Sequence, residues 1–89
     1  MMVAVRGDSF PRVGKVTSIP ATPSLQASIG VQWYHQQRAS HKPRWLRFFM
    51  PTPDVGNIKI EEIILYNFDL TKKGALKKKS RDYLQEQFL

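Results

Sequence analysis

Cysteine is absent from this 89-residue chain, and acidic residues are few. The lack of cysteine excludes a disulfide framework and a cysteine-ligated zinc site, and it favours a reducing, intracellular compartment. Long apolar runs are also missing, since none approaches the roughly 18 residues of a membrane span. The N-terminus lacks the charged segment and apolar stretch of a secretory leader. We therefore expect no membrane partner.

Charge of one sign dominates the composition. Seven Asp and Glu stand against 14 Lys and Arg, which gives a formal net charge of +7 at pH 7. No acidic residue lies between Ser9 and Pro53, although that span contains both arginine and lysine. Such a one-signed surface repels itself unless it meets an anion. The charge predicts a polyanionic partner, namely DNA, RNA or the nucleosome surface, and a solvated basic face is the alternative.

The length of the chain allows one domain with a small core. A chain this short buries about 60–65% of its extended surface on folding. The hydrophobic content of 42% is close to the globular average, so we expect a folded domain. The doubled Met1-Met2 looks like a start codon placed before a fragment. We therefore expect a single domain, residues 1–89, cut from a longer protein.

Short segments with a period of two recur along the chain, separated by turn-forming residues. The clearest alternation puts Ile29, Val31 and Trp33 on one face of a strand, which assigns Trp33 to the core. The pattern predicts strands over residues 2–5, 13–19, 29–35, 44–50 and 58–60, with loops over 20–24, 36–43 and 51–57.

Beyond Leu70 two interpretations remain open. One is a single helix from Thr71 to Phe88. The other is a turn over residues 72–74, a strand over 75–79 and a helix capped by Ser80. We prefer the second, because glycine inside a helix costs about 1 kcal/mol. The resulting fold class is mainly β: a small five-stranded antiparallel barrel over about residues 2–79, whose closure removes exposed edges, and a C-terminal helix over about 80–88.

Several short motifs resemble a known family. Gly7-Asp8, Val13-Gly14-Lys15-Val16 and the run from Ile29 to Tyr34 resemble the first three strands of SH3-like barrels of the Tudor type. The segments Ile63-Ile64-Leu65 and Gly74-Ala75-Leu76 look like the closing part of such a barrel. Bromo-adjacent-homology domains are a rival but usually longer. The resemblance covers about residues 2–76. It implies a nuclear, chromatin-associated module that binds histone tails, methylated lysine or arginine, or DNA.

The sequence offers little for catalysis. No phosphate-loop or dinucleotide glycine fingerprint occurs. His35 and His41 have no carboxylate nearby in sequence, and two histidines do not define a zinc site. Ser40-His41 has no evident third member of a nucleophilic triad. Glu61 and Glu62 are adjacent, so they point in different directions and do not form an acid–base pair. We therefore expect no enzyme activity, metal or cofactor.

Five aromatic rings lie between Ile29 and Phe49, more than the interior of so small a barrel holds. With Trp33 inside, the predicted ring surface consists of Tyr34, Trp45 and Phe49, with Asp8 or Asp54 beside it. Such rings can hold a methylated ammonium group by cation–π attraction. A second packed hydrophobic cluster under the C-terminal helix is the alternative.

Basic residues form two groups, one in and after the loop over residues 36–43 and one near the C-terminus. Arginine suits bidentate contact with phosphate, whereas lysine acts as a point charge. The predicted nucleic-acid-binding residues are Arg38, Lys42, Arg44, Arg47, Lys77, Lys78 and Lys79. We thus expect a non-enzymatic chromatin module that contacts DNA or a histone tail. The alternatives are an adaptor that receives an acidic peptide, and an accessory DNA-binding domain of a transposase-like protein.

Overall fold

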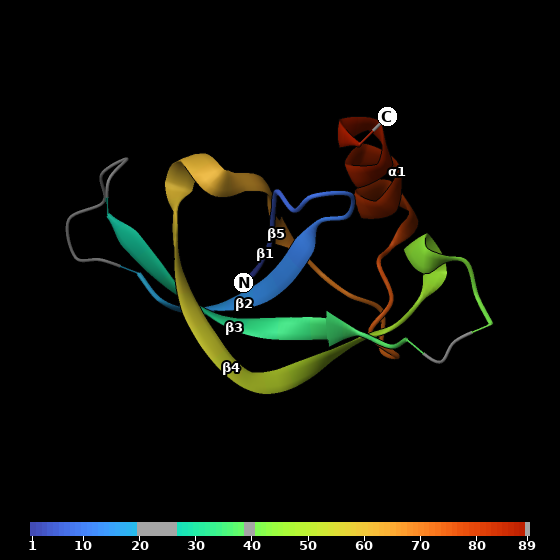
Figure 1. The fold of residues 1–89 in the computed structure, drawn as a ribbon, viewed down its shortest axis with the longest axis horizontal. Coiled ribbons are helices and arrows are strands. Elements are labelled where there is room, and N and C mark those ends of the chain that lie inside the picture. Colours follow the sequence, from blue (N-terminus) through green and yellow to red (C-terminus); the bar gives the residue numbers. More distant parts are fainter. Residues whose placement is uncertain (20–26, 39–40, 89) are drawn as a thin grey trace.

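The structure is a computed structural model that describes residues 1–19, 27–38 and 41–88. Strands dominate these residues, and a single α-helix follows near the C-terminus (Figure 1). In chain order the elements are β1 (Met2–Val5), β2 (Arg12–Ser18), β3 (Ser28–Gln36), the 3₁₀ turn η1 (Arg44–Leu46), β4 (Phe49–Lys59), the 3₁₀ turn η2 (Ile60–Glu62), β5 (Ile63–Phe68) and α1 (Lys78–Gln87).

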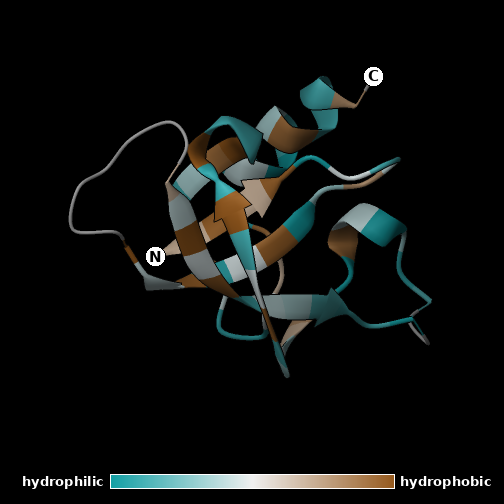
Figure 2. Ribbon diagram, turned by 60° about the vertical axis from the view of Figure 1, so that its left-hand side comes forward, coloured by the Kyte–Doolittle hydropathy of each residue, from teal (hydrophilic) through white to brown (hydrophobic). Residues whose placement is uncertain are grey.

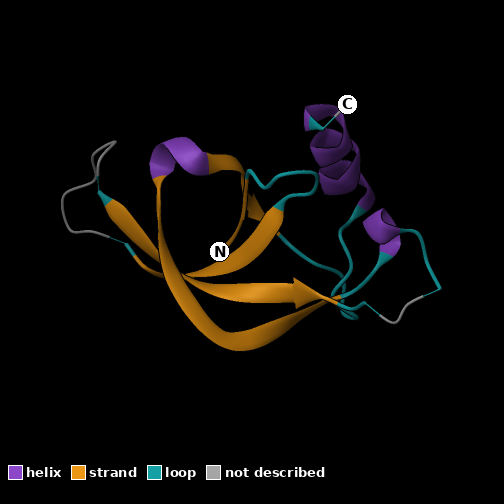
Figure 3. Cartoon of the chain, in the orientation of Figure 1, coloured by secondary structure: helices purple, strands orange, loops and turns teal. Residues whose placement is uncertain are grey.

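The strands form one antiparallel sheet in the order β4-β3-β2-β1-β5. Strands β1 to β4 follow one another as a meander, and β5 returns to pair with β1. Strand β4 bends strongly, so that η2 and β5 rise above the rest of the sheet (Figure 3). The mainly β class and the C-terminal helix are confirmed. In the described residues no ladder joins β4 to β5, so the sheet is open rather than closed as predicted.

Both faces of the sheet bury apolar side chains, and alternation along β1 shows why. Val3 and Val5 point to one face and Ala4 to the other, and all three are buried. The Trp33 cluster comprises the buried residues Val3, Val5, Ile29, Val31, Trp33 and Ile58. The Leu84 cluster comprises the buried residues Ala4, Phe10, Val13, Phe49, Phe68, Leu76 and Leu84. Figure 2 shows hydrophobic stretches, coloured brown, in the strands and in α1.

Trp33 is a core residue, as predicted, with 8% of its surface exposed. Its indole fits because two neighbours are glycine. Gly14 on β2 pairs with Trp33, and a Cβ added there would lie 3.2 Å from its Cε3 atom. A Cβ added at Gly56 on β4 would lie only 2.7 Å from its Nε1 atom. The missing side chains allow the ring to approach the backbone of both adjacent strands.

Two adjacent segments, residues 44–50 and 51–57, have structures that differ from the predicted ones. Residues 44–50, predicted as a strand, contain η1, and only their last two residues belong to β4. Residues 51–57, predicted as a loop, form the middle of β4. Pro51 and Pro53 are tolerated because β4 lies at the sheet edge, where one side of the strand needs no ladder hydrogen bonds.

Side chains reinforce β4 where these prolines lack N–H groups. The Thr52 hydroxyl donates to the Trp33 carbonyl at 2.9 Å, and the Gln32 amide donates to the Thr52 carbonyl at 2.9 Å. The pairing of β3 with β4 shifts register at this point. Such side-chain contacts depend on the neighbouring strand, so proline content alone misassigned the segment as a loop.

The C-terminal region follows the preferred interpretation in part. A turn over residues 72–74 is present, with Gly74 at a φ of 94° and its N–H donating to the Thr71 carbonyl. The predicted strand over 75–79 shrinks to one bridge between Leu70 and Leu76. Helix α1 begins at Lys78 with Lys77 as its N-cap, so Ser80 is not the cap. The predicted loop over 20–24, and Ser40, lie outside the described residues.

Replacing Gly56 by valine tests the packing of Trp33. The new side chain would meet the indole, and overpacking of this kind should lower the free energy of unfolding by about 1–3 kcal/mol in urea denaturation. Val55→Ala is the control, because Val55 is adjacent and 74% exposed. Its effect should stay within about 0.5 kcal/mol. Unchanged stability of Gly56→Val would contradict this packing.

Candidate functional site

A cavity of about 560 Å³ lies between the start of β2, the end of β3 and η1. Its apolar lining includes Phe10, Val13 and Trp33. Four arginines also line it, and we call it the arginine groove: Arg12, Arg38, Arg44 and Arg47. Among the residues that the structure describes, no Asp or Glu lines this groove. Its walls are therefore cationic over an aromatic floor.

Two of these cations lie over aromatic rings. The Arg12 guanidinium carbon lies 3.9 Å from the ring centroid of Trp33. The Arg44 guanidinium carbon lies 4.4 Å from the ring centroid of Phe10. Cation–π attraction positions the guanidinium groups without using their N–H donors. Those donors remain free to bind a partner.

Turn η1 is held in place by packing around Trp45. The Trp45 ring centroid lies 4.5 Å from that of Phe10 and 6.2 Å from that of Phe88, just beyond α1. The Gln36 side-chain amide donates to the Arg44 carbonyl, and Arg47 Nε donates to the Lys42 carbonyl at 3.0 Å. These contacts fix the backbone that carries Arg44 and Arg47, so that side of the groove is preorganised.

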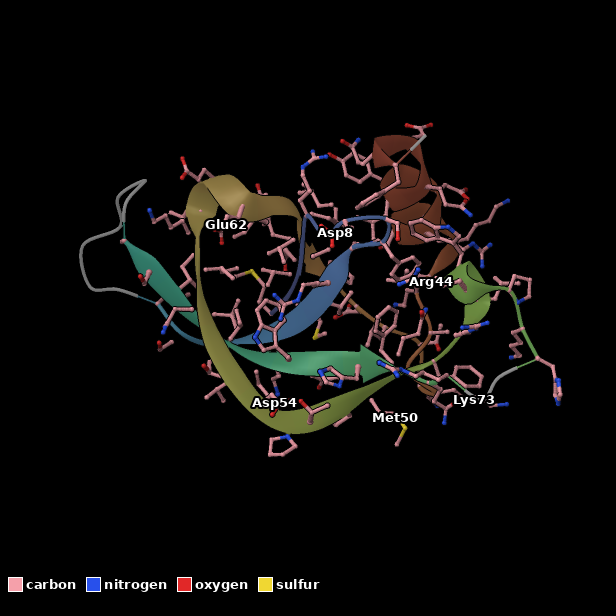
Figure 4. All side chains as sticks on the ribbon, in the orientation of Figure 1. Asp8, Arg44, Met50, Asp54, Glu62 and Lys73 are labelled. Atoms are coloured by element: carbon pink, nitrogen blue, oxygen red, sulfur yellow. The ribbon has the colours of Figure 1, made fainter. Side chains whose placement is uncertain are left out.

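In the described part of the chain, His35 is the one groove-lining residue that contacts a carboxylate. His35 Nε2 lies 3.6 Å from Asp54 Oδ2, and both side chains are exposed by more than 60%. None of the four groove arginines forms an ion pair with a carboxylate of the described residues. Figure 4 shows Asp54 on the bent part of β4, well separated from Arg44. The cations therefore produce an unbalanced positive potential that an anion would relieve.

The predicted ring surface does not form as expected. Phe49 is 5% exposed and belongs to the Leu84 cluster, so it is a core residue. Tyr34 and Trp45 are partly buried and pack against the same cluster. The alternation assumed for residues 44–50 placed Trp45 and Phe49 together on an outward face, but η1 turns Trp45 onto Phe10. The alternative prediction, a packed cluster under the C-terminal helix, describes these rings better.

The predicted basic residues lie in three places. Arg38, Arg44 and Arg47 meet in the groove, whereas Lys42 does not line it, and its ammonium group lies 4.2 Å from the ring centroid of Phe48. The remaining three, Lys77, Lys78 and Lys79, are exposed at the start of α1 and do not line it either.

Sequence reasoning missed Arg12, although a signal for it existed. Arg12 and Gly14 are two residues apart on β2, so they share a face, and Gly14 pairs with Trp33. A long side chain two positions from a glycine can reach the ring that the glycine admits. The predicted strand began at Val13, which left Arg12 in a loop.

Comparisons with protein-family models, with curated proteins and with solved structures give no match for this chain. Within the described ranges, no helix has the length and hydropathy of a transmembrane span. In the same ranges no three His, Cys, Asp or Glu side chains are close enough to share a metal ion. The function proposed below therefore rests on the geometry and charge of the arginine groove.

Replacing Trp45 by alanine tests how η1 is held. The variant loses two aromatic pairs, each worth about 0.5–1.5 kcal/mol, so the free energy of unfolding should fall by about 1–3 kcal/mol. Leu46→Ala in the same turn is the control, because Leu46 is 40% exposed and should contribute less. Chemical denaturation measures both variants. Equal losses would show that Trp45 does not anchor η1.

Proposed function

We propose that this chain is a non-enzymatic nucleic-acid-binding module that holds backbone phosphate in the arginine groove. The observation that carries the proposal is the set of four arginines without a carboxylate in the lining. A guanidinium group pairs bidentately with phosphate through its fixed fork of N–H donors. Stacking orders Arg12 and Arg44, and a hydrogen bond to backbone orders Arg47, which lowers the entropy lost on binding.

The same geometry disfavours a methylated lysine as the ligand. A methylammonium group is a cation, and the groove arginines would repel it. The rings expected to enclose it are packed in the Leu84 cluster. DNA is therefore the better supported of the two ligands predicted from the sequence. An acidic peptide remains the rival, since it also carries negative charge, but it lacks the regular phosphate spacing of a nucleic acid.

The fold and the cellular location of this chain are part of the same proposal. We infer an SH3-like domain of the Tudor type, acting on chromatin in the nucleus. An antiparallel meander whose fifth strand returns to the first is what such a barrel requires, and it supports this inference. The backbone N–H of Arg6 donates to the Glu62 carbonyl at 3.4 Å, which joins η2 to the end of β1. The bend of β4 brings the open side of the sheet toward closure (Figure 1).

The salt dependence of DNA binding tests the function. A labelled short duplex and its single strand should both bind, and log K should fall linearly with log salt because bound phosphate releases counterions. Arg44→Ala should weaken binding to all sequences and reduce the salt slope by about 1. Lys15→Ala is the matched control, since Lys15 is exposed on β2 and does not line the groove.

Two results of this titration would contradict the proposed function. One is the absence of binding at low salt. The other is an equal loss of affinity in Arg44→Ala and Lys15→Ala, because it would show that net charge matters and the groove does not. Fluorescence anisotropy at several salt concentrations provides both measurements.

The lysines at the start of α1 oppose the stability of that helix. Lys77 is the N-cap, Lys78 begins the helix, and its first turn holds no acidic residue. Positive charge there opposes the helix dipole, so Lys78→Glu should raise the free energy of unfolding by about 0.5–1.5 kcal/mol. If these lysines also contact phosphate, the same variant should bind DNA more weakly.

The control for this variant lies at the other end of α1. Gln87→Glu also makes the helix more negative, but at the negative end of its dipole, so it should not stabilise the chain. Urea denaturation and DNA titration measure the two properties separately. A less stable Lys78→Glu variant would contradict the dipole argument, and unchanged DNA affinity would remove Lys78 from the binding surface.

A further inference from the structure

A second cavity, of about 450 Å³, adjoins the arginine groove. Its lining includes Arg6, Glu61 and Glu62, and we call it the carboxylate hollow. Arg12 and Trp33 line both cavities. The stacked Arg12–Trp33 pair therefore lies between the arginine groove, which has no carboxylate in its described lining, and a hollow that two carboxylates line. Figure 4 shows Glu62 on η2 and Arg44 on η1, on opposite sides of the molecule.

The two carboxylates differ in their existing partners. Glu62 Oε2 accepts a hydrogen bond from the Lys59 backbone N–H at 3.1 Å, which closes η2. Glu61 is exposed and has no hydrogen bond or ion pair with another described residue. An ionised carboxylate accepts hydrogen bonds only. Glu61 is thus an acceptor without a partner among the described residues, and it lines the cavity next to the proposed phosphate site.

We propose that the groove and the hollow form one site for single-stranded nucleic acid, with a preference for a base that carries an amino group. This inference rests on the proposed function. A backbone phosphate binds in the arginine groove. The adjacent base stacks on the exposed face of the Arg12 guanidinium, whose other face lies over Trp33. The amino edge of that base then donates to Glu61.

The requirement for a free base edge selects a single strand. In a duplex the bases are stacked on one another and their pairing edges are occupied, so none can lie on Arg12 and reach Glu61. Among pyrimidines the carboxylate selects cytosine, because the cytosine N4 amino group donates to a carboxylate. Thymine has the O4 acceptor at the same position, and two acceptors repel each other. Cytosine and thymine are similar in size, so comparing them isolates this contact.

Anisotropy titrations with labelled oligodeoxycytidine and oligothymidine of about ten nucleotides, within the usual site size, test the inference at neutral pH. The unmodified chain should bind the cytidine strand about tenfold more tightly, as expected for one good base contact. Glu61→Ala removes both the acceptor for cytosine and a negative charge that repels thymine O4, so the affinity for oligothymidine should rise and the ratio of the two affinities should fall to about one. Glu86→Ala is the matched control, since Glu86 is exposed on α1 and lines neither cavity. It should leave the ratio unchanged.

A further variant tests the stacking step. Arg12→Lys keeps the charge but removes the guanidinium plane, so it should weaken binding of the cytidine strand at least fivefold, the lower end of the value of one stacked base. Its effect on a duplex of the same length should be smaller.

The outcomes distinguish a failure of this inference from a failure of the proposed function. Equal binding of the two strands, a ratio preserved in Glu61→Ala, or tighter binding of the duplex than of the cytidine strand would overturn this inference and leave the proposed function standing. Failure of every nucleic acid to bind at low salt would overturn the proposed function itself.

Discussion

The close packing of Trp33 against its neighbouring strands is the contact on which the rest of the structure depends. The indole occupies space left by Gly14 and Gly56, so it lies between β2 and β4 and closes one face of the sheet. Arg12 lies over its ring, which places a cation at the junction of two cavities. One buried ring thereby links the stability of the core to the geometry of the candidate binding surface. Aromatic rings suit this role because they combine a large apolar area with a face that attracts cations.

The charges of the groove and of α1 do not stabilise this protein. The arginines of the groove have no carboxylate partners in the described part of the chain, and the lysines of α1 lie at the wrong end of the helix dipole. Each arrangement carries a free-energy cost that an anionic partner would offset. Stacking on Phe10 and Trp33 lowers the cost of holding the arginines in place, because it orders them without neutralising them.

The open edge of the sheet is protected by the composition of β4. Pro51 and Pro53 remove backbone donors from this edge strand, and the Thr52 and Gln32 side chains bind it to β3. An edge with prolines pairs poorly with another chain, which limits aggregation. Three of the exposed hydrophobic residues, Met1, Ile19 and Tyr66, lie around an apolar cavity that Ile29 and Ile63 also line, whereas Met50 and Val55 are exposed on β4 itself.

Features of the fold that depend on local interactions could be predicted from the sequence. Features that depend on contacts between distant segments could not. Alternation in β1 and β3 identified those strands and the core position of Trp33, because a period of two is a local property of an extended chain. The turn before Ala75 was also predictable, since Gly74 adopts a positive φ that other residues avoid. The same pattern failed over residues 44–57, where the predicted strand contains η1 and the predicted proline-rich loop belongs to the edge strand β4. A strand edge, and therefore the tolerance of proline, exists only once the sheet is assembled.

The candidate site, like the fold, could be predicted from the sequence only in part. Composition alone determined a strong positive charge and a lack of acidic residues around Arg38, Arg44 and Arg47. Tertiary structure decided that Arg12 joins them, that Phe49 is buried, and that Lys77, Lys78 and Lys79 lie at a helix start outside the groove. Net charge is a sum over residues and needs no coordinates. The direction in which a side chain points depends on register, bulges and packing against strands that are distant in the sequence.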